Sequence, residues 1–154
     1  MNSRHKARET ALQILYRFDG AEKPSSSPIK PVGYEPASPA SMLKELNNHF
    51  SHFQTPEGIR EFAALLVAGT VREMTEIDEL IETHAANWKV SRMALVDRSL
   101  LRMATYELKN VADTPSSVVI DEAIELAKQF GNAESPAFVN GILDAIKSKV
   151  RQDE

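Results

Sequence analysis

The stretch VDRSLLRMATYEL, residues 96–108, indicates the fold class of this chain. Its apolar residues recur every three or four positions, the spacing at which side chains share one face of an α-helix. They are Val96, Leu100, Met103, Ala104 and Leu108. Polar residues fill most of the positions between them. The stretch therefore predicts an amphipathic helix that packs on a core through its apolar face.

The same spacing continues in both directions along the chain. It predicts helices over about 4–19, 40–53 and 56–86, a short turn or helix near 88–94, and two helices after the central stretch. The first of these two ends before Gly131, and the second begins at Ser135-Pro136. No stretch alternates apolar and polar residues for long enough to predict a strand. We therefore predict an all-α protein of about seven helices.

Proline marks the expected connections between these helices. Residues 21–40 hold five of the eight prolines and four serines, which predicts a loop to which we assign no function. Pro56 follows a threonine and precedes a glutamate, the pattern of a helix start. Pro115 marks a second boundary in the same way.

Composition and length narrow the class of protein. A chain of 154 residues is expected to form one domain. The absence of cysteine excludes a disulfide framework and thiolate chemistry. The longest apolar run, residues 62–68, is too short to span a membrane, and the basic N-terminus has no apolar segment typical of a secretory signal. We therefore expect a soluble, cytoplasmic protein.

The sequence offers no pattern of an enzyme. It has neither a glycine-rich phosphate loop nor a nucleophile elbow. His49 and His52 lack the further ligands that zinc requires. The acidic residues Asp121, Glu122 and Glu125 are interpreted as the solvated face of an amphipathic helix. We expect no catalytic residue, no metal site and no cofactor.

Charge is segregated along the chain. The net charge of −4 argues against a nucleic-acid-binding protein, but a binding face needs only local positive potential. Residues 1–8 contain three bases and His5 with no acid, whereas residues 73–82 contain five acids and no base. The distribution therefore leaves two possibilities open, an anion-binding N-terminus and an acidic surface for a basic partner.

The basic N-terminus is placed unfavourably for a helix. Bases in the first turns oppose the helix dipole, and Arg4 and Arg8 repel each other at a spacing of four residues. A bound polyanion would relieve both effects, and Gln13 and Tyr16 add an amide and a ring of the kind that readers of single-stranded RNA use. On this interpretation, replacing Arg4 and Arg8 by alanine weakens RNA binding and leaves thermal stability unchanged or slightly higher. The alternative is a frayed basic terminus with Tyr16 half-buried in the core.

A glycine interrupts the last predicted helix. Glycine inside a helix costs about 1 kcal/mol relative to alanine. We expect Gly141, which follows Asn140, to mark a close approach of another helix, with a ligand as the alternative.

Three parts of the chain together resemble the NusB antitermination family. Residues 4–16, RHKARETALQILY, resemble its basic opening. Residues 100–108, LLRMATYEL, resemble its central segment. The stretches DEAIELAKQFG (121–131) and FVNGILD (138–144) resemble its C-terminal signature, which is the most specific part. The resemblance covers nearly the whole chain except residues 21–40.

This resemblance implies a fold and a function. It implies two helical sub-bundles, residues 1–87 and 88–154, within a single domain. It implies binding of the single-stranded boxA element of ribosomal RNA leaders together with NusE, a small-subunit ribosomal protein. The complex would join RNA polymerase and promote processive transcription without catalysis. The implied RNA-binding residues are Arg4, His5, Lys6, Arg8, Gln13, Tyr16, Glu134 and Phe138, and the implied partner-facing residues are Asp97 and Leu101.

Two other readings stay open at this point. The chain is also similar to the N-terminal domain of some ribosomal RNA cytosine methyltransferases, but it lacks a cofactor-binding fingerprint, which favours binding without chemistry. The second alternative is a helical protein adaptor that binds no RNA and uses the acidic residues 73–82 to dock a basic protein.

Overall fold

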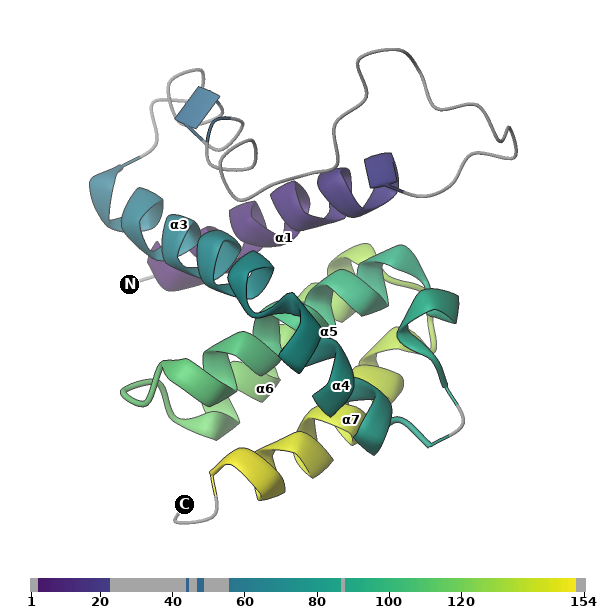
Figure 1. The fold of residues 1–154 in the computed structure, drawn as a ribbon. Helices are drawn as coiled ribbons and strands as arrows, with labels where there is room; N and C mark the ends of the chain where they lie inside the picture. Colours follow the sequence, from purple (N-terminus) through teal and green to yellow (C-terminus); the bar gives the residue numbers. More distant parts are fainter. Residues whose placement is uncertain (1–2, 23–43, 45–46, 49–55, 87, 152–154) are drawn as a thin grey trace.

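A computed structural model describes residues 3–22, 44, 47–48, 56–86 and 88–151 (Figure 1). Within these residues it contains α-helices and one short 3₁₀ helix, Val90–Arg92, but no strand. The all-α prediction is therefore confirmed. The α-helices are α1 (Ser3–Glu22), α3 (Glu57–Arg72), α4 (Met74–His84), α5 (Leu95–Asn110), α6 (Ser116–Phe130) and α7 (Ser135–Val150).

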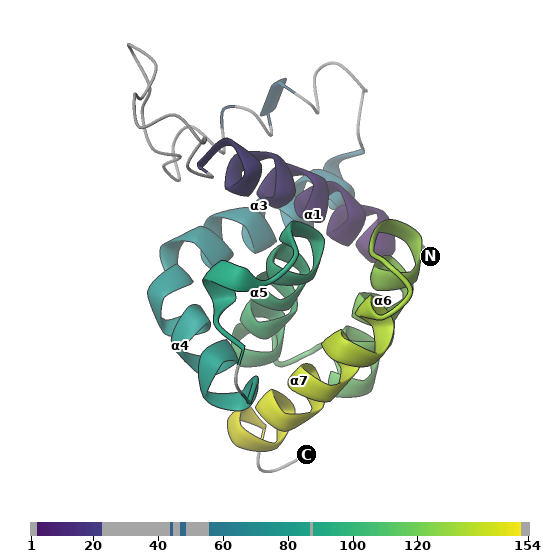
Figure 2. The same cartoon turned by 90° about the vertical axis from the view of Figure 1, so that its right-hand side faces the viewer.

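Helix α5, which includes residues 96–108, lies at the centre of the molecule. It packs against α1, α3, α4, α6 and α7, with α1 and α3 on one side and α6 and α7 on the other (Figures 1 and 2). Ten of its sixteen residues are buried, so the buried surface is much wider than the apolar face predicted from the spacing. Polar residues such as Thr105 and Glu107 are consequently part of the interior.

One hydrophobic cluster joins the described helices. It extends from Ala7 and Leu15 on α1, through Leu66 on α3, to Leu126 on α6 and Ile146 on α7. The cluster contains residues from both halves of the chain and does not separate them into two cores. The implied division into two sub-bundles stays a prediction. None of the described helices combines the length and the apolar character needed to cross a membrane.

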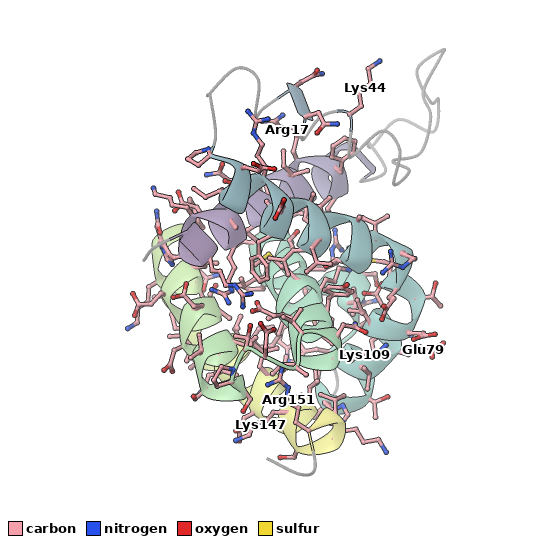
Figure 3. The ribbon with its side chains drawn as sticks, turned by 90° about the vertical axis from the view of Figure 1, so that its left-hand side faces the viewer. Arg17, Lys44, Glu79, Lys109, Lys147 and Arg151 are labelled. Atoms are coloured by element: carbon pink, nitrogen blue, oxygen red, sulfur yellow. The ribbon has the colours of Figure 1, made fainter. Side chains whose placement is uncertain are left out.

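The helix predicted over 56–86 is divided in the structure. Glu73 separates α3 from α4 with φ −102° and ψ 17°, outside the ideal helical range. Lys109 Nζ and Asn110 Nδ2 of α5 both donate to Glu73 Oε1, at 2.9 and 3.2 Å. Figure 3 shows Lys109 on the side of the molecule where α4 lies. Contacts with α5 therefore accompany a break that the local sequence does not signal.

Gly69 of α3 and Gly141 of α7 have opposite surroundings. A Cβ on Gly69 would lie 2.1 Å from Cζ of Tyr106, so any other residue there would force the Tyr106 ring or the two helices to shift. A Cβ on Gly141 would meet nothing within 4 Å. The expectation that Gly141 marks close helix packing is therefore wrong, since this residue faces open space among the described residues.

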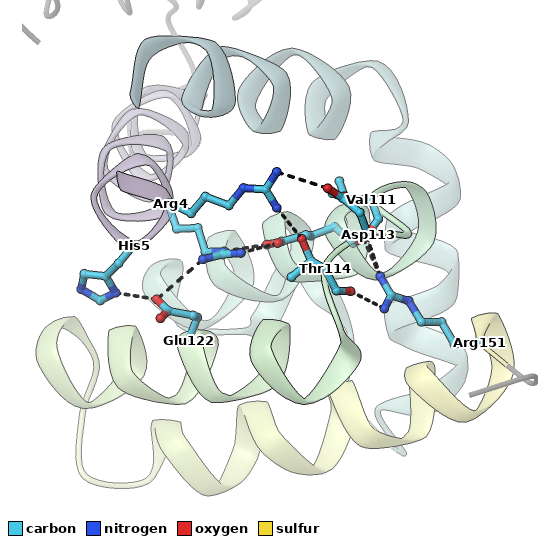
Figure 4. Close-up of polar contacts among 9 residues, drawn as sticks. Arg4, His5, Val111, Asp113, Thr114, Glu122 and Arg151 are labelled. Atoms are coloured by element: carbon cyan, nitrogen blue, oxygen red, sulfur yellow. Dashed lines mark hydrogen bonds and ion pairs between the residues drawn. The ribbon is translucent and has the colours of Figure 1, made fainter. Parts of the chain in front are cut away.

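Arg151 closes the carboxyl end of α5 from the end of α7. Its guanidinium donates to the carbonyl oxygens of Leu108 and Val111, both at 2.9 Å, and to that of Thr114 at 2.5 Å (Figure 4). The last carbonyls of a helix have no partner within the helix and carry its negative dipole end. A single cation therefore joins α7 to the end of the central helix.

Two sequence predictions lie outside the described residues. Nearly all of the loop expected over 21–40 and of the helix expected over 40–53 fall there, as do His49 and His52. Residues 21 and 22 are described and belong to α1, so the helix runs past the predicted start of the loop. Within the described part of the chain, no three histidine or acidic side chains are grouped in a way that could hold a metal ion.

Candidate nucleic-acid interface

Arg8 is buried between α1 and α5. Its Nε and Nη2 donate to the two carboxylate oxygens of Glu107 at 2.8 and 2.6 Å, and the two side chains are 4% and 1% exposed. Such a paired geometry is the strongest form of an ion pair between side chains. Burial leaves Arg8 no surface for a phosphate in this structure, so we do not include it in the candidate interface. The buried ion pair leads us to expect a contribution of Arg8 to stability, which differs from the expectation drawn from the sequence.

Arg4 lies at the edge of the same region and remains accessible. Its Nη1 donates to Thr114 Oγ1 at 2.8 Å, and its Nη2 lies 3.4 Å from Asp113 Oδ2 (Figure 4). The guanidinium also lies over the ring of Phe62, 4.5 Å from the centroid. About half of the side chain, 47%, is exposed. Arg4 is therefore oriented by its neighbours while one side stays available to an anion.

The remaining basic residues of the first turns also face acids. His5 Nδ1 forms a 2.5 Å hydrogen bond with Glu122 Oε2 of α6 (Figure 4). Lys6 Nζ lies 3.9 Å from Glu9 Oε2 and is largely exposed. Glu122 was expected only on a solvated face, but its carboxylate also contacts α1. The cations at this end of α1 are thus matched by acids, most of which come from distant parts of the chain.

Gln13 and Tyr16 lie apart from these basic residues. They are exposed on the second half of α1 and line a hollow of about 460 Å³ together with Val96 and Phe130. Tyr16 is twelve residues beyond Arg4, or roughly 18 Å along the helix. The structure therefore brings Gln13 and Tyr16 to the start of α5 and does not bring them to the basic end of α1.

Glu134 and Phe138 lie at the start of α7, where Asn132 Oδ1 accepts hydrogen bonds from the backbone N–H groups of residues 134 and 135. The ring of Phe138 packs edge-to-face against Trp88, with centroids 5.7 Å apart and an interplanar angle of 76°. Trp88 is 53% exposed and was not among the residues that the sequence predicted for a binding site. The only available signal was a lone tryptophan between polar residues, which does not by itself indicate a site.

The two residues expected to face a protein partner are both buried. Leu101 is fully enclosed in the core, which leaves it no surface for a partner in this structure, so we do not include it in a partner surface. Asp97 is 7% exposed, and its Oδ1 has no hydrogen-bond partner among the described residues. Asp97 lines a small hollow together with Trp88 and Phe138.

A larger hollow of about 690 Å³ lies beside the start of α5. Four of its charged residues are paired within the molecule: Arg98 Nε donates to Asp19 at 2.7 Å, and Arg102 binds both carboxylate oxygens of Asp78 at 2.8 and 2.9 Å. This hollow and the two described above all include residues between 93 and 97. The start of α5 therefore borders all three of these hollows.

Comparison with known proteins extends over nearly the whole chain. The model of the NusB family matches residues 5–148. A transcription antitermination protein NusB from Desulfotalea psychrophila is 41% identical over 149 residues, covering 96% of this chain and 97% of the relative. The solved structure of T. maritima NusB has a TM-score of 0.76 at 31% identity, covering 95% of this chain and 91% of that one.

A further similar structure comes from a complex. A chain in the structure of the antitermination factors NusB and NusE with double-stranded RNA has a TM-score of 0.75 at 29% identity, covering 97% of this chain and 98% of that one. The curated relatives are antitermination proteins, a class without catalytic activity. The agreement of family model, relatives and fold shows that this chain belongs to the NusB family of transcription antitermination proteins.

Proposed function

We propose that this protein binds the single-stranded boxA element of ribosomal RNA leaders together with NusE, as part of an antitermination complex on RNA polymerase in the cytoplasm. The observation that carries the proposal is the match, over 97% of this chain, to a structure that contains NusB, NusE and RNA. Membership of the NusB family supports the same role.

The RNA surface is proposed at the first turns of α1. Arg4 and Lys6 keep 47% and 63% of their side chains exposed, and His5 lies between them. The acids that face these cations weaken the local positive potential, so RNA phosphates compete with Asp113 and Glu9 for them. The expected complex is therefore sensitive to salt, because its main attraction is electrostatic.

The surface for NusE is proposed around the start of α5. Val96 and the exposed ring of Tyr16 line one hollow there, and the larger hollow with Arg98 adjoins it. An exposed aromatic side chain beside a concave surface is typical of a protein interface. We therefore assign Gln13 and Tyr16 to the protein partner and no longer to RNA.

The experiment is fluorescence anisotropy of a labelled boxA-like RNA titrated with the protein, alone and with NusE. A scrambled RNA of the same length and composition serves as the control. We expect preferential binding of the boxA-like RNA that NusE strengthens. Equal binding of both RNAs, or none with NusE present, contradicts the proposal.

The structure does not favour the alternative of an adaptor that docks through its acidic segment. Four of the five acids in residues 73–82 already have partners within the molecule: Glu73 and Glu76 bind Lys109, Asp78 binds Arg102, and Glu82 accepts the backbone N–H of Val90. A basic partner would have to displace these contacts.

A further inference from the structure

A small hollow of about 170 Å³ separates the start of α5 from the start of α7. We call it the Trp88 hollow; its lining residues are Trp88, Met93, Ala94, Asp97, Asn132, Glu134 and Phe138. Pockets for drug-sized ligands usually measure about 300–1,000 Å³. This one is smaller, so it suits a single flat ring or the end of one side chain.

The carboxylate of Asp97 is the unusual group in this hollow. Only 7% of Asp97 is exposed, yet among the described residues no donor binds its Oδ1. Its place in the first turn of α5 is favourable for the helix dipole, but the dipole does not replace a hydrogen bond. A buried carboxylate oxygen without a donor is costly, so the hollow is suited to an occupant that brings N–H groups.

The aromatic residues define the shape of that occupant. Phe138 packs edge-to-face on Trp88, which orients the indole, and more than half of Trp88 remains exposed. An exposed indole is a stacking platform of the kind that proteins use for bases of single-stranded RNA. A nucleobase that stacks there brings its hydrogen-bonding edge close to Asp97.

Among the four bases, guanine matches a carboxylate best. Its Watson–Crick edge carries two neighbouring donors, N1–H and N2–H, which can bond the two oxygens of one carboxylate. Adenine, cytosine and uracil each place an acceptor beside their donor, and that acceptor repels the carboxylate. Because a carboxylate only accepts hydrogen bonds, it discriminates between these edges.

We propose that the Trp88 hollow binds one guanine of the bound RNA, stacked on Trp88 and hydrogen-bonded to Asp97. This inference rests on the proposed function, because it requires that the protein binds RNA. It assigns Asp97 to RNA recognition, whereas the family resemblance placed this residue at the protein partner. Phe138 acts indirectly, since it holds the indole in place.

Trp88 is the only tryptophan of the chain, so its fluorescence reports on this hollow directly. The probes are the heptamer UUUGUUU and versions with inosine or adenosine at the central position, each also measured by anisotropy with a label at one end. We expect quenching by the guanosine heptamer and affinity higher than for the adenosine heptamer by roughly tenfold. Inosine lacks the N2 amino group and should be intermediate.

Asp97→Asn tests the carboxylate without changing its size. We expect this variant to lose the preference for guanosine, because an amide presents one donor to the base. Asp121→Asn removes the same charge from an exposed position on α6 and should keep the preference. Circular dichroism melting of both variants checks that each remains folded.

Three results overturn the inference, and they differ in what they leave standing. Equal binding of the three heptamers, with Trp88 fluorescence unchanged, removes the guanine site and leaves RNA binding intact. Quenching of Trp88 by NusE that depends on Asp97, with no response to guanosine, shows that a basic side chain of a protein occupies the hollow. Absence of any RNA binding in anisotropy removes both the inference and the proposed function.

Discussion

Arg8 and Glu107 form an ion pair in which both partners are almost completely buried. The two residues are 99 positions apart, and their contact joins α1 to the central helix. A buried pair contributes little when it is compared with well-packed apolar residues, but the loss of one partner leaves an uncompensated charge. The arginine that the sequence places among surface cations is therefore a structural residue here.

Arg8→Met should lower the free energy of unfolding by about 3–5 kcal/mol, because Glu107 is left buried without a counter-charge. The double substitution Arg8→Met with Glu107→Met should recover a large part of that loss. Urea unfolding followed by circular dichroism measures both. Arg4→Ala is the matched control, since its ion pair is exposed, and unfolding of Arg8→Met at the wild-type urea concentration would contradict the assignment.

Gly69 and Gly141 give opposite predictions. Gly141→Ala should stabilise the protein by about 1 kcal/mol, because it gains helix propensity in open space. Gly69→Ala should destabilise it by about 1–3 kcal/mol, because the added methyl group overlaps the buried ring of Tyr106. Thermal melting of the two variants side by side measures the difference, and equal melting temperatures would show that α3 and α5 separate without cost.

At the scale of helices, the junction between α3 and α4 depends on one acid and its partners. A hydrogen bond from Lys109 lowers the pKa of Glu73 below its ordinary value, and burial opposes this change. The same hydrogen bond raises the pKa of Lys109. Because the pKa of Glu73 is lower when folded, its contribution to stability is present above the unfolded pKa and is lost as the pH falls through the folded one.

Glu73→Gln should lower the free energy of unfolding at pH 7 by about 1 kcal/mol, which is at the upper end of the range for a partly exposed ion pair. The difference from the unchanged protein should shrink as the pH falls below about 4.3, the ordinary pKa of glutamate. Urea unfolding over a series of pH values tests this dependence. Glu79→Gln, an exposed acid on the adjoining helix α4, should show no comparable loss at pH 7; a pH-independent difference for Glu73→Gln would contradict the charge-based explanation.

The sequence predicted those helix boundaries that have local causes. Helix starts after Pro56 and Pro115 and the helix end before Gly131 agree with the structure, since each depends on adjacent residues. The break at Glu73 was missed because the partners of this residue are 36 and 37 positions away. The role of Arg8 was misjudged for the same reason, whereas Arg4 and Lys6 are accessible as the sequence suggested.

At the scale of the whole molecule, the candidate surfaces are separated along the helices. Arg4 in the basic turns of α1 contacts Thr114, just before α6, whereas the Trp88 hollow lies beyond the end of α6 at the start of α7. Helix α6 has 15 residues and is therefore roughly 22 Å long. An RNA strand that contacts both surfaces must follow the molecule over this distance, although the protein as a whole is negatively charged.

The combined substitution Arg4→Ala with Lys6→Ala should reduce the salt dependence of RNA binding. Each lost contact with a phosphate of single-stranded RNA lowers the slope of log affinity against log salt by about 0.7. Anisotropy titrations at several salt concentrations measure the slope. Lys149→Ala, at the exposed end of α7, should leave it unchanged; an unchanged slope in the double variant would place the phosphate contacts elsewhere.

The contact of Arg151 with the end of α5 also affects the order of folding during translation. Its carbonyl partners at Leu108 and Val111 are made 43 and 40 residues earlier during translation. At about 5–20 residues per second, the central helix waits roughly 2–9 s for the side chain that caps it. During that interval the nascent chain carries a helix whose terminal carbonyls lack their final partner, and folding reaches completion only when the last helix has been synthesised.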